Sequence, residues 1–323
     1  MTDEPERALP AGMPRPRPGD PVESAVASRL ARTWGRRATV RRAERDLDPA
    51  AEAFDPELQD YPDSLLPFGA HPAYLAYDEE QRRRIRAWAW ISFNKNVMDV
   101  ERCVVEPGFD VLAQDRLAAG VSGDLGIAVY QSMVDEQYHT LMHHGGSEFT
   151  RTHRGWPLPN WILPQAQSAR RRSVALSRCT DERAGSITSL AYTTVAEISI
   201  TTYLDLFADD PVVQPFHRAT VRLHNRDEYC HASITADAAA IVYDTLTADE
   251  RTHFEHALVD AMDAFTSNDY TTWRAVLHTE SLNDAMIRDV ETDTATGRLV
   301  QDYSGIRSLA DDLGITGRLD WEW

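Results

Sequence analysis

Lysine is almost absent from this chain. Lys95 is the only one, so arginine supplies nearly all of the 33 basic side chains, and 51 acidic side chains give a formal net charge of -18. Because so acidic a surface repels polyanions, we expect neither nucleic acid nor an anionic membrane as a partner. Cations bound by some of the carboxylates would offset part of this charge.

Cysteines and long apolar runs are also scarce. Cys103, Cys179 and Cys230 are widely spaced and form no CxxC pair, which is typical of reduced thiols in a cytosolic protein rather than of a disulfide framework. The N-terminal stretch lacks the apolar core of a secretory signal, and no apolar run is long enough to span a bilayer. The sequence therefore predicts a soluble, cytoplasmic protein.

Few prolines and glycines interrupt the longest segments, and the 42% of hydrophobic residues are enough for a substantial core. Apolar residues near helical spacing predict four long helices, at about residues 78–105, 124–144, 181–207 and 212–246. The first is expected to end at the EPG triplet that follows Val105, and the second at Gly145-Gly146. Further helices are expected at 248–266 and 269–287, and no period-two pattern indicates a strand.

The rest of the chain surrounds these helices. Residues 1–21 are rich in proline, arginine and acidic residues and are expected to be a disordered tail, with 22–323 as a single domain. Residues 22–45 predict an amphipathic helix with a basic, solvated face, and 48–77 an extended wrap over the core. Residues 147–182, rich in Arg and Pro, are expected to be an irregular crossover between the second and third long helices.

Two look-alike segments lie within the second and fourth of these helices. Asp135-Glu136-Gln137-Tyr138-His139 and Asp227-Glu228-Tyr229-Cys230-His231 both read Asp-Glu-x-x-His. A Glu and a His three apart lie on one face of a helix, so each pair can offer a carboxylate oxygen and an imidazole nitrogen to one metal ion. A single such pair is more often two solvated neighbours, but two copies with the preceding Asp are a much stronger signal.

Glu101 and Glu197 complete the pattern, because each lies among apolar residues in the long helix that precedes one of the two segments. Two Glu-x-x-His pairs, each with one glutamate from another helix, are the ligand set of ferritin-like di-iron and di-manganese bundles. The sequence therefore predicts an all-α, ferritin-like four-helix bundle with a two-metal carboxylate site. Wrapping segments and C-terminal helices are expected in addition.

His224 is a candidate for an additional ligand. It lies four residues before Glu228 and seven before His231, so the three side chains fall within roughly 60° of arc on one helix. A buried histidine with a packing role is the alternative that this spacing leaves open. The full set of predicted metal ligands is Glu101, Glu136, His139, Glu197, His224, Glu228 and His231.

Two aspartates and several other histidines accompany these ligands. Asp135 and Asp227 each lie one turn before the histidine of their segment, and we expect them to accept the N–H of a metal-bound imidazole, with a simple surface charge as the alternative. Mixed carboxylate and imidazole ligands favour iron, with manganese as a substitute, over zinc. The histidines without partner spacing are expected to be structural or exposed: His143, His144, His153, His217, His253 and His256.

The ligand pattern and several other stretches resemble the di-iron arylamine N-oxygenases. The resemblance covers most of the chain and rests on DYPDSLLPF (60–68), HPAYLA (71–76), LHNRDEYCH (223–231) and LVQDYSG (299–305). It implies a homodimeric, ferritin-like enzyme with two irons. Such enzymes use dioxygen and an external electron donor to oxidise an aromatic amine through hydroxylamine and nitroso stages to a nitro group.

The departures from this family concern the substrate. Where its aminobenzoate-oxidising members have Arg in an LVRDFSG stretch, to pair with the substrate carboxylate, this chain has Gln301; a Tyr of that pocket is replaced by Phe93 and an Asn by Thr201. Because replacing Arg by Gln removes a bidentate, charged anchor, the substrate is not expected to be a free aminobenzoate. We expect a small-molecule amine that is neutral, amide-bearing or tethered to a carrier protein.

Two other functions would use the same residues. A related di-iron site hydroxylates carbon or desaturates, and a ferritin-like bundle stores iron or scavenges peroxide. The additional imidazole of His224 favours N-oxygenation over the first of these. The long wrapping and C-terminal segments, which are suited to enclosing a substrate, favour it over the second.

Overall fold

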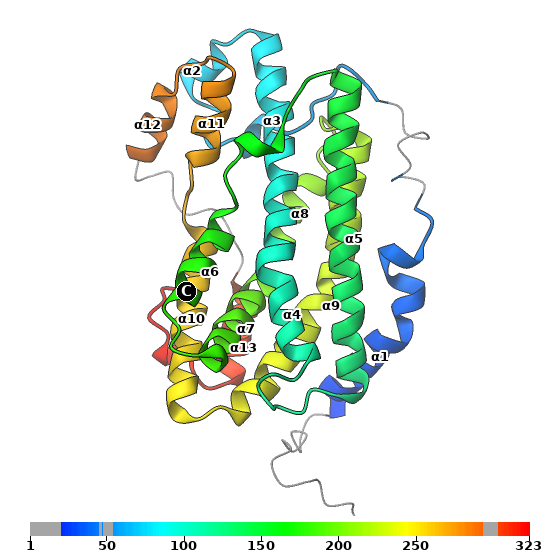
Figure 1. The fold of residues 1–323 in the computed structure, drawn as a ribbon. Helices are drawn as coiled ribbons and strands as arrows, with labels where there is room; N and C mark the ends of the chain where they lie inside the picture. Colours follow the sequence, from blue (N-terminus) through cyan, green and yellow to red (C-terminus); the bar gives the residue numbers. More distant parts are fainter. Residues whose placement is uncertain (1–20, 45–46, 48–53, 293–302) are drawn as a thin grey trace, which may run out of the picture.

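The computed structural model describes residues 21–44, 47, 54–292 and 303–323, and Figure 1 shows that they form a bundle of helices. Within these ranges the only β contact is an isolated bridge between Gln59 and Val213, so the predicted all-α fold is confirmed. No helix in them combines the length and apolar character needed to cross a bilayer. Most of the predicted tail, and the segment that contains Gln301, lie outside the described residues.

A four-helix bundle forms the centre of the molecule (Figure 1). Its members are α3 (Glu79–Val100) with a π-helical turn (Glu101–Val105) and α4 (Glu106–Ala113), α5 (Gly123–Arg154), α7 (Glu182–Ser199) with α8 (Thr201–Ala208), and α9 (Pro215–Thr245). Around the bundle, α3 contacts α5, α5 contacts α9, α9 contacts α7, and α7 closes the ring against α4.

The prediction that the EPG triplet ends the first long helix is wrong. Helical backbone continues through the π turn and Pro107 to Ala113. Pro107 occupies the first turn of α4, where a missing backbone N–H is least costly. Gly108 lies so close to α7 that a Cβ atom there would be 1.9 Å from Thr193 Oγ1. The triplet therefore allows α4 to approach α7.

The prediction that Gly145-Gly146 ends the second helix is also wrong, because α5 continues to Arg154. Gly146 is a point of close approach between α5 and α3. A Cβ atom there would lie 2.9 Å from Cζ2 of Trp90, and the Trp90 indole N–H donates to the Gly146 carbonyl over 3.0 Å. The helix ends instead at Gly155, whose φ of 66° is typical of a helix C-terminus.

The segments around the third long helix also differ from prediction. The helix begins after Asp181, whose side chain accepts a hydrogen bond from the Ala184 N–H, and this start is as predicted. It does not run unbroken to 207, because α7 gives way to α8 at Ile200. The preceding crossover is not irregular throughout, since it contains α6 (Gln167–Ser177).

Outer elements cover the bundle (Figure 1). α1 (Pro21–Arg37) packs on α5 and α9, whereas α10 (Ala248–Thr266) lies where predicted and packs on α6 and α7. The single helix predicted at 269–287 is wrong, because two separate helices occupy this region. The remaining elements are α11 (Thr271–Thr279), α12 (Ala285–Thr292), α13 (Ser304–Asp312), α2 (Pro72–Leu75), and the 3-10 turns Thr39–Arg41, Asp63–Leu65, Asn160–Ile162 and Thr316–Arg318.

Candidate metal centre

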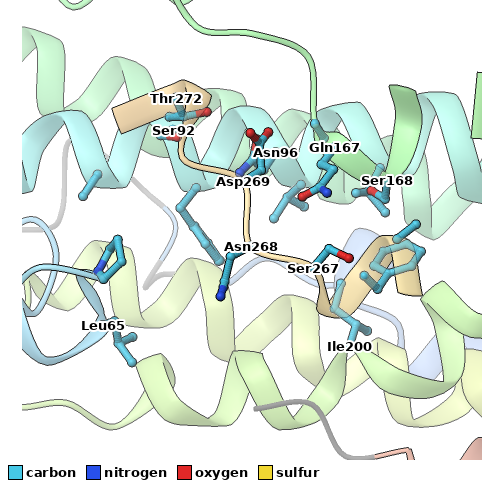
Figure 2. Close-up of a pocket in the computed structure, with 18 of the residues that line it drawn as sticks. Leu65, Ser92, Asn96, Gln167, Ser168, Ile200, Ser267, Asn268, Asp269 and Thr272 are labelled. Carbon is cyan, nitrogen blue, oxygen red and sulfur yellow. The ribbon is translucent and has the colours of Figure 1, made fainter. Parts of the chain in front are cut away.

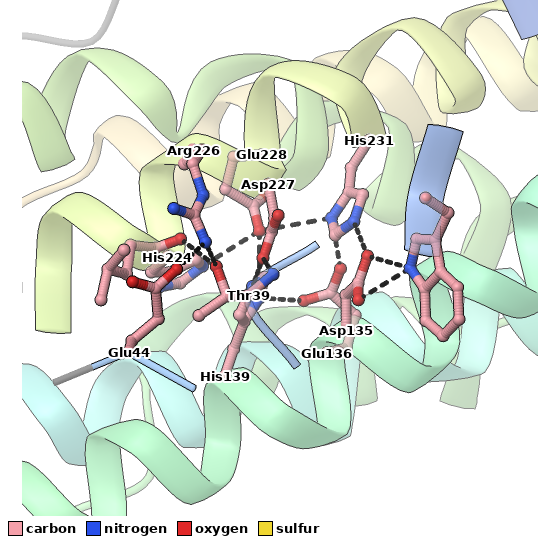
Figure 3. Close-up of polar contacts among 12 residues, drawn as sticks. Thr39, Glu44, Asp135, Glu136, His139, His224, Arg226, Asp227, Glu228 and His231 are labelled. Atoms are coloured by element: carbon pink, nitrogen blue, oxygen red, sulfur yellow. Dashed lines mark hydrogen bonds and ion pairs between the residues drawn. The ribbon is translucent and has the colours of Figure 1, made fainter. Parts of the chain in front are cut away.

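The seven predicted ligands meet in the interior of the bundle. Glu101 opens the π turn after α3, Glu197 lies near the end of α7, and α5 and α9 supply the others. None of the seven exposes more than 2% of its surface. Figure 3 shows the side chains from α5 and α9 pointing toward one another: Glu136, His139, His224, Glu228 and His231.

Two groups within this cluster have the geometry to hold a metal ion. In each group, one ligand atom per residue lies within 4.8 Å of the others. Glu136 and His139 belong to both groups and so lie between the two positions. Glu197 reaches the cluster through Oε2, which is 3.6 Å from His231 Nδ1. The groups are Glu101, Glu136, His139 and His224, and Glu136, His139, Glu228 and His231.

The three imidazoles do not present the same ring nitrogen to the carboxylates. His139 Nδ1 lies 2.9 Å from Glu136 Oε2, and His231 Nδ1 lies 2.6 Å from Glu136 Oε1. His224 is turned the other way, with Nε2 lying 3.0 Å from Glu228 Oε1. Metal ions in the two groups would therefore meet Nδ1 of His139 and His231 but Nε2 of His224.

Asp135 and Asp227 lie behind the imidazoles, where they were predicted to accept ring N–H groups, but the pairing crosses between the two segments (Figure 3). Asp135 Oδ2 is 3.3 Å from Nε2 of His231, and Asp227 Oδ2 is 3.4 Å from Nε2 of His139. Both aspartates are buried, so neither is a surface charge. Each carboxylate can hold the imidazole of the opposite helix with its proton on Nε2, which leaves Nδ1 free to bind a metal.

The N-terminal segment holds both aspartates in place. The Trp34 indole N–H, at the end of α1, lies 3.0 Å from each carboxylate oxygen of Asp135. The backbone N–H of Thr39 donates to Asp227 Oδ2 over 3.1 Å. Sequence reasoning missed both residues, because the partners are 101 and 188 positions away and no local spacing connects them.

Trp34→Phe is expected to weaken metal binding about tenfold. Residues that hydrogen-bond to the groups around a metal ligand typically contribute 10–100-fold to metal affinity. The phenyl ring keeps most of the packing but cannot donate to Asp135. Metal titration of the stripped protein would measure the loss. Trp161→Phe is the matched control, because Trp161 is 85% exposed. Wild-type affinity in Trp34→Phe would contradict the role given to this contact.

His143 is a further residue of the centre. It was predicted to be structural or exposed, and the structure places it fully buried with Nε2 2.8 Å from His224 Nδ1 and Nδ1 2.7 Å from Asn94 Oδ1. A signal was present in the sequence: His143 is four residues after His139 and seven after Glu136. These are the spacings, in reverse order, that single out His224 on α9.

Burial and neighbouring charges shift the pKa values of the ionisable groups in the cluster in different directions. Burial holds the pKa of the Glu101 carboxyl well above its usual value, and the negative charges of Glu136 and Glu228 add to this. For Glu136 itself burial opposes ionisation, but the imidazoles of His231 and His139 outweigh it and lower the pKa. Burial likewise opposes protonation of His139, yet Glu136 beside it raises the pKa.

The charges of the cluster fit divalent metal ions. In the described structure every ion-pair partner of the four glutamates is a histidine. Oε2 of Glu101 and Oε2 of Glu197 are buried without a hydrogen-bond donor. Buried carboxylates are costly unless they are paired, and two divalent cations would balance four of them. Carboxylate and imidazole donors suit iron or manganese.

A cavity of about 310 Å³ lies between the bundle and its outer helices, with lining residues from α3, α6, α7 and α10 (Figure 2). Val97 and Val100 of α3 and Ala196 of α7 line it. Val100 and Ala196 directly precede Glu101 and Glu197 in the chain, so the cavity reaches the turns that carry these two carboxylates. None of the seven candidate ligands is among the described lining residues, and the approach to the cluster is through the neighbours of Glu101 and Glu197 along the two helices.

Charged side chains are scarce around the cavity. Among the described lining residues Asp269 is the only carboxylate, and none is Lys, Arg or His. Burial opposes ionisation of Asp269, but hydrogen bonds from Thr271 and from Arg170, 2.6 Å away, lower its pKa and keep it charged. Figure 2 shows several uncharged polar residues around the same space: Ser92, Asn96, Gln167, Ser168, Ser267, Asn268 and Thr272.

The three predicted substrate residues have different positions. Phe93 lines the cavity, and its ring meets the His143 ring edge-on with centroids 5.7 Å apart. Thr201 follows the lining residue Ile200 but is not among the lining residues that the structure describes. Gln301 lies outside the described residues. The role of Gln301 therefore stays a prediction.

Comparison with known proteins finds one family along nearly the whole chain. The family model described as P-aminobenzoate N-oxygenase AurF matches residues 20–314, a span that contains all seven candidate ligands. The 4-aminobenzoate N-oxygenase of Streptomyces thioluteus is 30% identical over 304 residues, which is 94% of this chain and 90% of that relative.

Proposed function

Because the chain belongs to the p-aminobenzoate N-oxygenase family, we propose that it is a non-haem di-iron enzyme that oxidises the nitrogen of an arylamine whose far end carries no negative charge. The observation that carries the proposal is that none of the described residues lining the cavity, which reaches the turns of Glu101 and Glu197, is a cation. An external electron donor and a second copy of the chain are the proposed partners.

The first oxidation is balanced when an amine, dioxygen, two electrons and two protons give a hydroxylamine and water. Two irons, when bound, would supply the oxygen chemistry of this step, and the external donor would supply the two electrons. The chain's own residues would hold the irons and place the amine. Glu101 and Glu197 directly follow the lining residues Val100 and Ala196, so they would hold metal ions near this side of the cavity. Val97, Val100 and Ala196 keep the reacting end of the cavity apolar.

The charges around the cavity support a substrate whose end remote from the amino group is uncharged. A buried carboxylate costs several kcal/mol without a cation, and none of the described lining residues is a cation. Arg170 is committed to Asp269, whose own negative charge would repel an aminobenzoate. The serine, asparagine and glutamine side chains of the cavity can instead hydrogen-bond an amide or a similar neutral group. An amide also stands in for the thioester by which a carrier protein would present the amine, because both replace the carboxylate with an uncharged group.

The test compares 4-aminobenzoate with 4-aminobenzamide in the iron-loaded enzyme. We expect the amide to have the higher kcat/KM, and Gln301→Arg to shift the preference toward the acid by about 1–2 kcal/mol, the scale of a charge-assisted hydrogen bond. Mass spectrometry would identify hydroxylamine, nitroso and nitro products. Gln114→Arg, which adds the same charge at an exposed position, is the control.

The outcomes separate the proposals. Efficient use of 4-aminobenzoate by the wild type, with no dependence on residue 301, would overturn the uncharged substrate class. Oxygen insertion at carbon, or desaturation, would replace N-oxygenation with the other di-iron chemistry. Iron accumulation without turnover of any amine would favour storage.

A further inference from the structure

The histidines of the metal centre are supported in two different ways. His139 and His231 each have a buried aspartate behind the ring nitrogen that faces away from the cluster. Among the described residues, no carboxylate faces the outward ring nitrogen of His224. Its outward Nδ1 meets Nε2 of the neutral ring of His143, and that ring ends on the side-chain amide of Asn94. The three hydrogen-bonded residues, Asn94, His143 and His224, are all fully buried.

We propose that Asn94 and His143 are positioning residues that hold His224 in the tautomer whose Nε2 is free to bind metal. The direction of the hydrogen bonds gives this result. Asn94 Oδ1 can only accept, so His143 carries its proton on Nδ1 and donates it there. Nε2 of His143 is then an acceptor, and Nδ1–H of His224 donates to it. The proton of His224 is thereby kept on the side away from the carboxylates.

If the hydrogen bonds ran in the opposite direction, a proton on Nε2 of His224 would prevent this nitrogen from binding metal. If the Asn94 amide were turned to donate its N–H, His143 would donate to His224 Nδ1, and the remaining proton of His224 would occupy Nε2. That nitrogen is 3.0 Å from Glu228 Oε1, at the position a metal ion would need. The orientation of one buried amide therefore selects whether His224 is a ligand.

The neutral support also distinguishes the two metal positions. A carboxylate behind a metal-bound imidazole raises its basicity, and a neutral imidazole behind it does so less. The group with His224 and Glu101 therefore binds its ion more weakly than the group with His231 and Glu228. The weaker position is the one beside α3, whose Val97 and Val100 also line the cavity. This inference rests on the proposed two-metal site.

The test is a titration of the metal-stripped full chain with Co²⁺, followed by calorimetry and by the visible absorption of the bound ion. The wild type is expected to bind two equivalents with different affinities. In His143→Leu the weaker equivalent should lose about 10–100-fold in affinity while the tighter one is unchanged. His144→Leu is the matched control, because this neighbour on α5 is exposed.

Two variants of Asn94 separate positioning from packing. Asn94→Asp gives His143 a charged acceptor and is expected to tighten the weaker equivalent, whereas Asn94→Leu is expected to loosen it. If Asn94 served only to pack the core, both variants would lower the unfolding temperature of the metal-stripped protein. The affinity of the weaker metal ion would then not change separately from that of the tighter one. If His143→Leu does not fold, the opposite shifts of the two Asn94 variants still decide the matter.

Two results have different consequences. If the wild type binds two equivalents and the variants of His143 and Asn94 bind both with unchanged affinity, the positioning role is wrong and the two-metal site stands. If the wild type itself binds no metal, the proposed function fails before this inference is reached.

Discussion

Glu136→Ala is expected to retain less than roughly a tenth of the iron bound by the wild type, for which about two irons per chain are expected. Glu136 belongs to both groups that have the geometry to hold a metal, and its two oxygens face His139 and His231. Removing it takes a ligand from both positions at once. The fold should survive, because alanine is the best helix former and α5 needs no carboxylate there.

Iron content after loading and desalting would measure the loss, with circular dichroism to confirm that the helices remain. Glu148→Ala on the same helix is the matched control, because Glu148 is exposed and bonds only to Arg151 in the described structure. Full iron occupancy in Glu136→Ala would refute the assignment of the metal site.

His224→Ala is expected to keep the fold and lose N-oxygenation by at least roughly 100-fold, since even the partners of metal ligands are worth 10–100-fold. Nε2 of His224 faces Glu228 and Glu101, and the ring makes no contact that α9 needs in order to be helical. The alternative left open by the sequence, a packing histidine, predicts lower stability with normal turnover.

Product formation per bound iron, together with the unfolding temperature, would distinguish these cases for His224→Ala. His256→Ala is the control, because this histidine is exposed on α10 and far from the cluster in the chain. Normal turnover of the variant would make His224 a packing residue and would remove the basis for the positioning role of Asn94 and His143.

The parts of the centre that were predictable have local signals. Glu136 with His139, and Glu228 with His231, stand at helical spacing, so one turn of sequence places each pair on one face. The same periodicity predicted the long helices and hence the all-α fold. His143 could have been found in this way, since its spacing from His139 repeats that of His224 from Glu228.

The predictions that were wrong concern features that depend on contacts between segments far apart in the sequence. Gly146 and Gly108 look like helix ends, but each is a point where one helix touches another, at Trp90 and at Thr193. Local rules for glycine and proline describe the isolated chain, and tertiary packing overrides them where close approach is needed. The crossed pairing of the two aspartates is likewise a property of the assembled bundle.

The contacts of Trp34 and Thr39 also set the order of events when the protein is made. The N-terminal segment leaves the ribosome first, yet Thr39 must wait for Asp227, 188 residues later. At about 5–20 residues per second that wait lasts roughly 10–40 s. Until then no nascent fragment contains both crossed Asp–His pairs, so the site closes only once most of the chain has been synthesised. Metal binding at this site is therefore expected to be a late event in biogenesis.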